Sequence, residues 1–305
     1  MQVFSDLSLL SSFKNSCVTI GNFDGLHLGH KVLIDGILEE KEKNQFLDIV
    51  ITFWPHPRKI LYSNREHFPI TTREYRLYLL KKMGVSTVLE LPFDEKLSRL
   101  SAEDFVKQYL LNLNIKTLII GHDFALGRGR SGHAGILKNL SNKFNFSIKV
   151  KSPVYVDGEL VSSSSIRQYL KVGDIQSVNK LLGRPFGFSG RVIHGDGRGS
   201  KIGYPTANIE LPDSMVPANG VYATKLTESN GESRFSVTNI GIKPTFDGQC
   251  ITIESFLLNF NETLYDKIVH LEFLGRIRAE RKFSSVNELV LQIAKDIDTA
   301  KNFFK

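Results

Sequence analysis

Gly21-Asn22-Phe23-Asp24-Gly25-Leu26-His27-Leu28-Gly29-His30 is the stretch that decides the fold of the first half of the chain. A short apolar run at residues 18–20 precedes it, and a mixed run at residues 31–38 follows. This order predicts a strand, a tight glycine-rich turn and the start of a helix. Backbone N–H groups at a helix N-terminus bind anions, and glycine lets a phosphate chain approach the backbone closely. The stretch therefore predicts a site for a nucleoside triphosphate that is attacked at its α-phosphorus.

Length and composition indicate a globular protein large enough for two domains. The chain has 305 residues, of which 41% are hydrophobic and 23% are charged, and both fractions are ordinary for soluble proteins. No apolar run is long enough to span a bilayer, and residues 1–6 lack the features of a signal peptide. Cys17 and Cys250 are far apart and form no metal-binding pair. We therefore expect a cytoplasmic protein with no membrane partner.

The basic charge of the chain has two explanations. A net charge of +7 and a pI near 9.2 are compatible with nucleic acid and also with small anionic substrates. The lysines and arginines are spread along the chain, whereas nucleic-acid-binding proteins usually gather them on one face or segment. We therefore expect no nucleic-acid partner.

Strands and helices alternate in the first half. Three apolar runs predict buried strands, at residues 47–53, 87–91 and 117–120. Capping patterns at Thr71 and Ser101 predict the starts of helices between these strands. The alternation predicts a parallel sheet with helices on both faces, and ligands of such sheets bind beyond the carboxyl ends of the strands. Residues 21–30, residues 55–57 and the loop beginning at Gly121 all follow strands, so we expect them to converge on one crevice.

The second half contains short apolar runs separated by turn residues. These runs lie at residues 190–193, 221–226, 235–240, 251–258 and 268–274. Turns such as Asn230-Gly231 and Asp247-Gly248 separate them, and the pattern predicts an antiparallel barrel or sandwich. Ser285 and Glu288 cap a final helix. We place the domain boundary near residue 183, giving domains at residues 1–183 and 184–305.

His27 and His30 are the candidate catalytic groups of the first half. A lone histidine is usually a core residue, and a zinc site is another explanation. Two histidines with glycines in a strand-to-helix turn favour a ligand site, and no third ligand at metal spacing accompanies them. Imidazole N–H groups could stabilise the charge that builds on an α-phosphate and a leaving pyrophosphate without a covalent intermediate.

A serine run at residues 162–165 precedes a predicted helix, and Arg167 lies one turn into that helix. Serine runs are usually flexible loops or helix caps. Here Ser163, Ser164 and Arg167 offer hydroxyl, N–H and guanidinium groups to phosphate oxygens, so the run and the histidines predict a two-sided phosphate clamp. The loop at residues 121–130 has the glycine spacing of a nucleotide-binding loop, although a solvated basic loop has the same composition.

A glycine-rich segment and candidate metal ligands open the second half. The segment contains Gly195, Gly197, Gly199, Lys201 and Gly203. A hairpin loop would explain it, and the Gly-Lys-Ser/Thr order of a Walker A loop is missing. A glycine flap could nevertheless close over phosphates. Thr206 and Asn208 share a face if extended, and their neutral oxygens suit Mg²⁺.

Glu254 is a charged residue inside the apolar run at residues 251–258. An edge strand with Glu254 facing water would explain it. The functional alternative is a general base, because the phosphorylation of an alcohol needs a group that takes the hydroxyl proton and a metal that neutralises phosphate charge.

The histidine stretch, the serine–arginine run and the loop at Gly121, in this order and spacing, resemble the adenylyltransferase half of the bacterial bifunctional riboflavin kinase/FAD synthetase family. This resemblance implies a Rossmann-like nucleotidyltransferase sheet. It implies ATP binding by Gly21, Asn22, Phe23, Asp24, Gly29, Ser163 and Ser164, beside His27, His30 and Arg167. It implies flavin binding near Pro55, His56, Pro57, Asp123 and Phe124. The family has threonine and arginine where this chain has Ser164 and Ser165. This chain therefore lacks the family's positive charge at position 165.

Successive motifs of the second half resemble the riboflavin kinase module of the same family. They lie at residues 195–208, 220–222, 239–246, 254 and 278–283. The resemblance implies a six-stranded antiparallel barrel with a terminal helix, Mg²⁺ at Thr206 and Asn208, and Glu254 as the base that activates the ribityl 5′-hydroxyl. It implies ATP binding by Gly195, Gly197, Lys201, Gly203, Gly220 and Tyr222, and a flavin contact from Arg278. The family often has histidine and aspartate where this chain has Phe256 and Asn259.

These observations predict a bifunctional enzyme. It would phosphorylate riboflavin to FMN and then transfer AMP from a second ATP to FMN, releasing pyrophosphate. The expected partners are riboflavin, FMN and ATP, with Mg²⁺ as cofactor, and the expected state is a monomer or weak homo-oligomer. One alternative is a kinase whose adenylyltransferase half is impaired by Ser165. The others are a nucleotidyltransferase with a different acceptor, which leaves the second half unexplained, and an RNA-binding protein, which gives no role to His27, His30 or Glu254.

Overall fold

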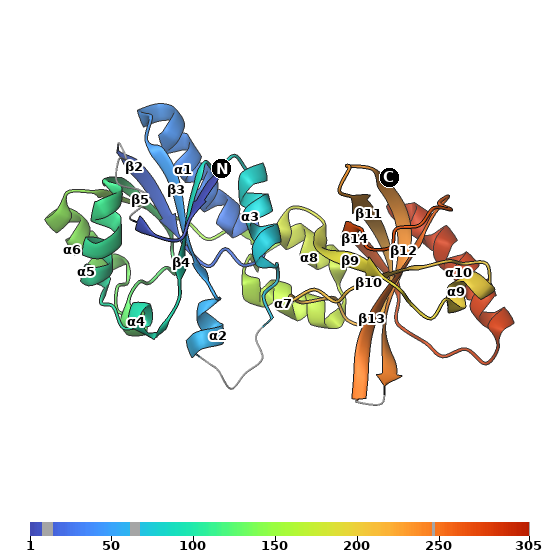
Figure 1. Ribbon diagram of the computed structural model, residues 1–305. Coiled ribbons are helices and arrows are strands. Elements are labelled where there is room, and N and C mark those ends of the chain that lie inside the picture. The colour runs from blue at the N-terminus through green and yellow to red at the C-terminus, as the bar shows by residue number, and fades with distance from the viewer. Residues whose placement is uncertain (8–14, 62–67, 246–247, 305) are drawn as a thin grey trace. The chain divides into compact units, whose positions relative to one another are not determined.

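The structure is a computed structural model that describes residues 1–7, 15–61, 68–245 and 248–304 (Figure 1). The chain forms two compact units. The first consists of residues 1–69 and 73–161, and the second consists of residues 70–72 and 162–305. None of the helices in the described ranges is both long and apolar enough to cross a membrane.

The first unit contains a sheet of six parallel strands in the order β1-β4-β3-β2-β5-β6. The strands are β1 (Gln2–Phe4), β2 (Ser16–Ile20), β3 (Leu47–Trp54), β4 (Thr87–Pro92), β5 (Ile115–Gly121) and β6 (Ser147–Lys151). β3 and β4 lie on one side of β2, whereas β5 and β6 lie on its other side. The loops after β2 and β5 therefore flank the point where the strand order reverses, which is where parallel sheets bind ligands.

Helices cover both faces of this sheet (Figure 1). They are α1 (Leu28–Asn44), α2 (Pro57–Leu61), α3 (Arg73–Lys82), α4 (Glu95–Ser98), α5 (Ala102–Phe105) and α6 (Ala134–Phe144). Short 3-10 turns at Leu111–Leu113 and Arg128–Arg130 and a hairpin of β7 (Tyr155–Val156) and β8 (Glu159–Leu160) complete the unit. The predicted parallel sheet is confirmed.

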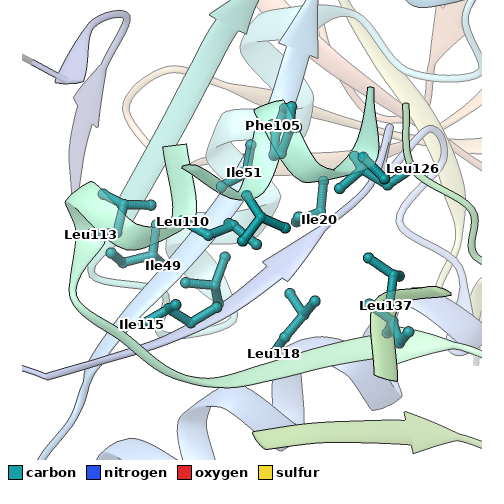
Figure 2. Close-up of a cluster of buried hydrophobic side chains, with 14 of the residues drawn as sticks. Ile20, Ile49, Ile51, Phe105, Leu110, Leu113, Ile115, Leu118, Leu126 and Leu137 are labelled. Atoms are coloured by element: carbon teal, nitrogen blue, oxygen red, sulfur yellow. The ribbon is translucent and has the colours of Figure 1, made fainter. Parts of the chain in front are cut away.

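Alternation along the strands builds two cores. Ile49 and Ile51 of β3 join the core under α4, α5 and α6, and Figure 2 shows them with Phe105 and Leu137. Val50 joins the core under α1 and α3. Successive strand residues point to opposite faces, so a strand covered on both faces is apolar throughout. The continuous apolar run at residues 47–53 reflects this burial.

The helix predicted from Ser101 begins there but is irregular. The Ser101 hydroxyl accepts a hydrogen bond from the Asp104 N–H at 3.1 Å, which confirms the cap. After α5 the backbone continues as a π-helix at Val106–Leu110. The cap depends on two residues three apart in the chain, whereas no pattern in the sequence indicated the change of helix type.

The second unit contains a closed barrel of six strands in the order β10-β13-β12-β11-β14-β9, and every neighbouring pair is antiparallel. The strands are β9 (Phe186–Ile193), β10 (Ala207–Ile209), β11 (Gly220–Glu228), β12 (Ser233–Thr245), β13 (Gly248–Leu257) and β14 (Ile268–Arg278). The predicted six-stranded antiparallel barrel is confirmed. Apolar runs did not reveal β10, because it is only three residues long.

Helices α7 (Ser163–Val172) and α8 (Ile175–Leu182) belong to the barrel unit. The Asn179 side chain of α8 donates to the Phe273 carbonyl at 2.8 Å and accepts from the Phe186 N–H at 2.7 Å. Arg276 of β14 donates to the carbonyl of Val172 at 2.8 Å. These bonds tie both helices to barrel strands.

The barrel also carries α9 (Arg198–Lys201), the terminal helix α10 (Val286–Ala300) and a last 3-10 turn at Lys301–Phe303. Ser285 caps α10 by accepting from the Glu288 N–H at 3.2 Å, as predicted. Ala300 packs against the outer face of β11 and β12. Phe246 and Asp247, which the sequence placed in a motif and a turn, lie outside the described residues.

Candidate active sites

The histidine turn (residues 21–30) connects β2 to α1. His27 is the N-cap of α1, and its Nδ1 accepts a hydrogen bond from the His30 N–H at 3.3 Å. The two rings stack with centroids 3.7 Å apart. An accepting Nδ1 places the proton of a neutral ring on Nε2, which can then donate to an anion. The turn thus brings the two predicted catalytic histidines together at a helix N-terminus.

Unusual backbone and close packing shape this turn. Phe23, Gly25 and Leu26 have φ values of 49°, 83° and 43°, a left-handed region that non-glycine residues seldom adopt. A Cβ atom on Gly29 would lie 3.1 Å from the ring of His27. Glycine at position 29 therefore allows the observed placement of the histidine.

The predicted flavin segment, Pro55-His56-Pro57, follows β3 and leads into α2. His56 is 7% exposed, and its Nδ1 accepts a hydrogen bond from the Arg58 N–H at 3.1 Å. The histidine thus holds the first turn of α2. Its predicted role in flavin binding stays a prediction.

The Gly121 loop (residues 121–130) follows β5. Arg130 closes the loop by donating to the carbonyl of Asp123 at 2.7 Å. A Cβ atom on Gly127 would lie 2.6 Å from the Ala102 backbone nitrogen, so the base of the loop packs tightly on the start of α5. The Asp123 side chain is exposed, while Phe124 packs against the sheet core. The loop is therefore a closed turn on a fixed base.

The serine–arginine run (residues 162–167) forms the start of α7. The Ser162 hydroxyl accepts from the Ser165 N–H at 3.1 Å and lies 3.0 Å from the Ser165 hydroxyl. Ser163 and Ser164 are the first two residues of the helix. Arg167 donates through Nη1 to the sulfur of Met215 at 3.3 Å. The clamp that would pair this helix with the histidine turn stays a prediction.

Strand register groups the candidate residues of the barrel. Glu254 of β13 lies opposite Asn208 of β10 and opposite Asn239 of β12. Directly opposed residues of antiparallel strands project to the same face. The three side chains therefore form one row on one face of the sheet. The sequence placed Asn239 in a family motif but gave it no role in the site, because only register assigns it to this row.

The glycine segment (residues 195–203) folds back onto the metal-ligand candidates. A Cβ atom on Gly195 would lie 2.1 Å from the amide nitrogen of Asn208, and one on Gly199 would lie 3.4 Å from the Thr206 hydroxyl. Lys243 of β12 pairs with Asp196 at 2.5 Å and holds the segment to the barrel. The segment thus forms a close cover over Thr206 and Asn208.

Several predicted barrel contacts have other roles in the structure. Tyr222 is fully buried, its hydroxyl donates to the Ala218 carbonyl, and burial raises its pKa to about 12. Gly220 adopts φ 159° against the Arg278 carbonyl. Arg278 forms a bidentate pair with the buried Asp296 of α10 at 2.8–3.0 Å. The adenine and flavin contacts proposed for these residues stay predictions, as do those of Lys201, Gly197 and Gly203.

Two charged residues in the first unit were not identified from the sequence as functional. Arg76 of α3 and Glu90 of β4 are 4% and 6% exposed and pair at 2.9 Å. Burial lowers the pKa of Arg76, and the carboxylate of Glu90 opposes this effect. The sequence did contain a signal for this pair. Glu90 lies inside the apolar run at residues 87–91, and a buried charge requires a partner.

Comparison with known proteins covers both units. Residues 10–165 match the family model described as FAD synthetase, and residues 182–304 match the one described as riboflavin kinase. A bifunctional riboflavin kinase/FMN adenylyltransferase of Buchnera aphidicola is 40% identical over 95% of this chain and 94% of its own length. A protein of the same description from Haemophilus influenzae is 36% identical over 100% of this chain and 99% of its own length.

A solved structure of similar fold bears a different description. It is named a macrolide-efflux protein from Streptococcus pneumoniae, is 31% identical and has a TM-score of 0.90 over 99% of this chain and 98% of that one. The two family matches and the full-length relatives agree with the order of motifs along the sequence. This chain belongs to the family of bifunctional riboflavin kinase/FMN adenylyltransferases.

Proposed function

We propose that the barrel unit phosphorylates riboflavin to FMN and that the histidine turn serves the transfer of AMP from ATP to FMN. The family and the two matched regions support both reactions. The observation that carries the kinase assignment is the row of Asn208, Glu254 and Asn239 beneath the glycine segment.

Glu254 is the proposed base of the kinase reaction. The ribityl hydroxyl oxygen forms a bond to the γ-phosphorus of ATP, its proton passes to the Glu254 carboxylate, and the bond to ADP breaks. The base must lie beside the phosphate-binding residues for this transfer. The register that sets Glu254 opposite Asn208 supports such a placement.

Thr206 and Asn208 are the proposed holders of Mg²⁺. Both offer neutral oxygen atoms, which suit a magnesium ion that is shared with phosphates and water. The close approach of Gly195 and Gly199 to these side chains fits a phosphate chain lying beside them. When bound, the ion would neutralise charge on the transferred phosphate.

His27 and His30 are the proposed catalytic residues of adenylyl transfer. An FMN phosphate oxygen bonds to the α-phosphorus of ATP, and the bond between that phosphorus and pyrophosphate breaks. The histidine N–H groups stabilise the charge that develops on the phosphate oxygens. The predicted contacts of Arg167, Ser163 and Ser164 with ATP phosphates, and of residues 55–57, 123 and 124 with flavin, complete the proposed site.

The proposed functional halves are residues 1–183 and 184–305, acting as a monomer or weak homo-oligomer in the cytoplasm. Two free cysteines, the buried Cys17 and the exposed Cys250, suit a reducing compartment. Riboflavin, FMN and ATP are the proposed partners. The kinase-only alternative has no support from the comparisons, because both regions match their families.

Two point variants of the full-length protein test the two assigned sites. Purified protein is incubated with ATP and Mg²⁺ and either riboflavin or FMN, and the flavin products are separated by chromatography. We expect Glu254→Gln to lose at least about 100-fold in FMN formation and to keep FAD formation from FMN. We expect His27→Ala to show the reverse, with a similar loss in FAD formation. Glu272→Gln, in β14 of the same barrel, is the control.

The outcomes separate the two assignments. Full-speed FMN formation by Glu254→Gln would refute the base, and full-speed FAD formation by His27→Ala would refute the histidine site. Wild-type protein that makes neither flavin product, with oxidised or reduced flavin, would refute the proposed function as a whole.

A further inference from the structure

A buried arginine joins the histidine turn, to which the proposed function assigns ATP, to the end of β3, which leads into the proposed flavin segment. Arg76 donates through Nη1 to the carbonyl of Asn22 at 3.0 Å and through Nη2 to the carbonyl of Phe53 at 3.3 Å. Asn22 belongs to the histidine turn after β2, and Phe53 lies near the end of β3, just ahead of Pro55. One rigid guanidinium group therefore contacts the histidine turn and the strand residue two positions ahead of the flavin segment.

Glu90 fixes the orientation of this guanidinium. Its Oε1 accepts from Nη2 of Arg76 at 2.9 Å, while Oε2 accepts from Nε of Arg73 at 2.5 Å. Glu90 lies opposite Thr52 in the parallel pairing of β3 and β4, and the Thr52 hydroxyl donates to the same Asn22 carbonyl at 3.4 Å. The Asn22 carbonyl thus accepts from Arg76 of α3 and from Thr52 of β3, and Glu90 of β4 orients the arginine.

Packing alone does not explain an ionic group at this place. Desolvation of a buried ion pair often cancels its attraction, so an apolar pair of similar size would stabilise the fold as well or better. The Nε–H of Arg76 is buried and has no hydrogen-bond partner among the described residues, which adds to that cost. The forked geometry of the side chain is what an apolar residue could not supply.

We propose that Arg76 is a positioning residue for adenylyl transfer, which sets the spacing between the histidine turn and the flavin segment, with Glu90 holding its guanidinium in place. This inference rests on the proposed function of these two loops. Arg76 acts through the carbonyls of Asn22 and Phe53 and touches neither substrate. Its loss should therefore impair the use of ATP and of FMN together.

The decisive variant is Arg76→Lys in the full-length protein. Lysine keeps a positive charge beside Glu90 but lacks the planar fork that reaches two carbonyls at once. Arg73→Lys is the matched control, because Arg73 shares Glu90 and, in the described part of the chain, bonds to neither loop. Glu90→Gln is the second test variant, because it loosens the guanidinium without removing it.

For each variant, kcat and the KM values for ATP and FMN are measured in FAD synthesis, and riboflavin phosphorylation by the same preparation serves as the internal control. We expect Arg76→Lys to lose about 10- to 100-fold in kcat/KM for both substrates, because small displacements of reacting groups have effects of this size. Glu90→Gln should lose less. The kcat/KM values of Arg73→Lys in FAD synthesis should stay within about threefold of wild type. The rate of riboflavin phosphorylation should stay within about twofold of wild type in all variants.

Two results would overturn the inference. If Arg76→Lys and Glu90→Gln lower only the unfolding temperature and keep wild-type kcat and KM in FAD synthesis, the pair is merely structural. If KM rises for one substrate alone, Arg76 does not set the spacing of two loops. Failure of the wild-type protein to make FAD from FMN and ATP would instead refute the proposed function, and the inference with it.

Discussion

The Nη1 atom of Arg167 lies 3.3 Å from the sulfur of Met215. Arg167 is the predicted phosphate ligand of adenylyl transfer, whereas Met215 lies between β10 and β11 of the barrel. Both residues belong to the second compact unit. The helix that bears Arg167 is therefore held by the barrel unit, so the predicted role of Arg167 implies that a change in the barrel alters adenylyl transfer.

Removal of the Met215 contact should weaken the use of ATP in FAD synthesis. A sulfur acceptor is weak, so we expect Met215→Ala to raise the KM for ATP by about two- to fivefold. Met215→Leu keeps most of the volume without the acceptor and should give a similar increase. Steady-state FAD synthesis with varied ATP measures the effect. Wild-type KM values in both variants would show that the contact does not position Arg167.

Gly29→Ala should separate activity from stability. Alanine favours a helix by up to about 1 kcal/mol over glycine, so the unfolding temperature should hold or rise. The new Cβ would lie 3.1 Å from the His27 ring, which must then move by a few tenths of an ångström. We expect FAD synthesis to fall by about 3- to 10-fold while kinase activity is unchanged.

The chain contains a matched control for this change. Gly135 follows the N-cap residue His133 of α6 by two positions, and a Cβ atom there would lie 3.3 Å from that ring. Gly135→Ala should therefore leave FAD synthesis within about twofold, because His133 is assigned no role. Equal losses in the two variants would mean that the strain at the helix start, and not the placement of His27, lowers the rate.

Gly195→Ala should impair the kinase through Asn208, its proposed metal ligand. The new Cβ would lie 2.1 Å from the Asn208 amide nitrogen, so either the amide or the glycine segment must move. We expect FMN formation to fall at least about tenfold, with more Mg²⁺ needed for half-maximal rate. Gly231→Ala is the control for backbone strain in the barrel, because its φ of 90° disfavours alanine although nothing lies within 4 Å of the new Cβ. An unchanged Mg²⁺ titration would argue against a metal at Asn208.

The two thiols should differ sharply in reactivity. Burial raises the pKa of Cys17 to about 12, whereas Cys250 is exposed. At pH 8 the thiolate fraction of Cys17 is then about 1 in 10⁴, and thiolate is the reactive form. Mass spectrometry after brief iodoacetamide treatment should find one alkyl group on the folded protein and two on the unfolded one. Rapid modification of Cys17 in the folded protein would contradict its burial in the sheet.

Much of the fold could be predicted because it depends on local pattern. The caps at Ser101 and Ser285 were read from residues three apart in the chain and are present. The apolar run at residues 47–53 indicated a strand buried on both faces, and β3 is one. Caps and strand burial follow from side-chain chemistry and periodicity, so a single sequence contains them.

Other features depended on partners far along the chain. Strand β10 is too short for a periodic signal, and it exists because β9 and β13 pair with it. The π-helix at Val106–Leu110 replaces an expected regular helix. The pairing of Arg278 with Asp296 joins a predicted ligand residue to the terminal helix. Each of these features depends on contacts between residues that are far apart in the sequence.

The sequence by itself determined the two fold classes, the caps, and the candidate residues His27, His30, Thr206, Asn208 and Glu254, because these are contained in short motifs and in the spacing of apolar residues. Only the tertiary structure decided which candidates share a face and which buried groups support them. It placed Asn239 beside Glu254 through register, and it brought Arg76 to the carbonyls of Asn22 and Phe53. Register and buried polar pairing arise from many weak contacts between distant segments, and no local pattern specifies their sum.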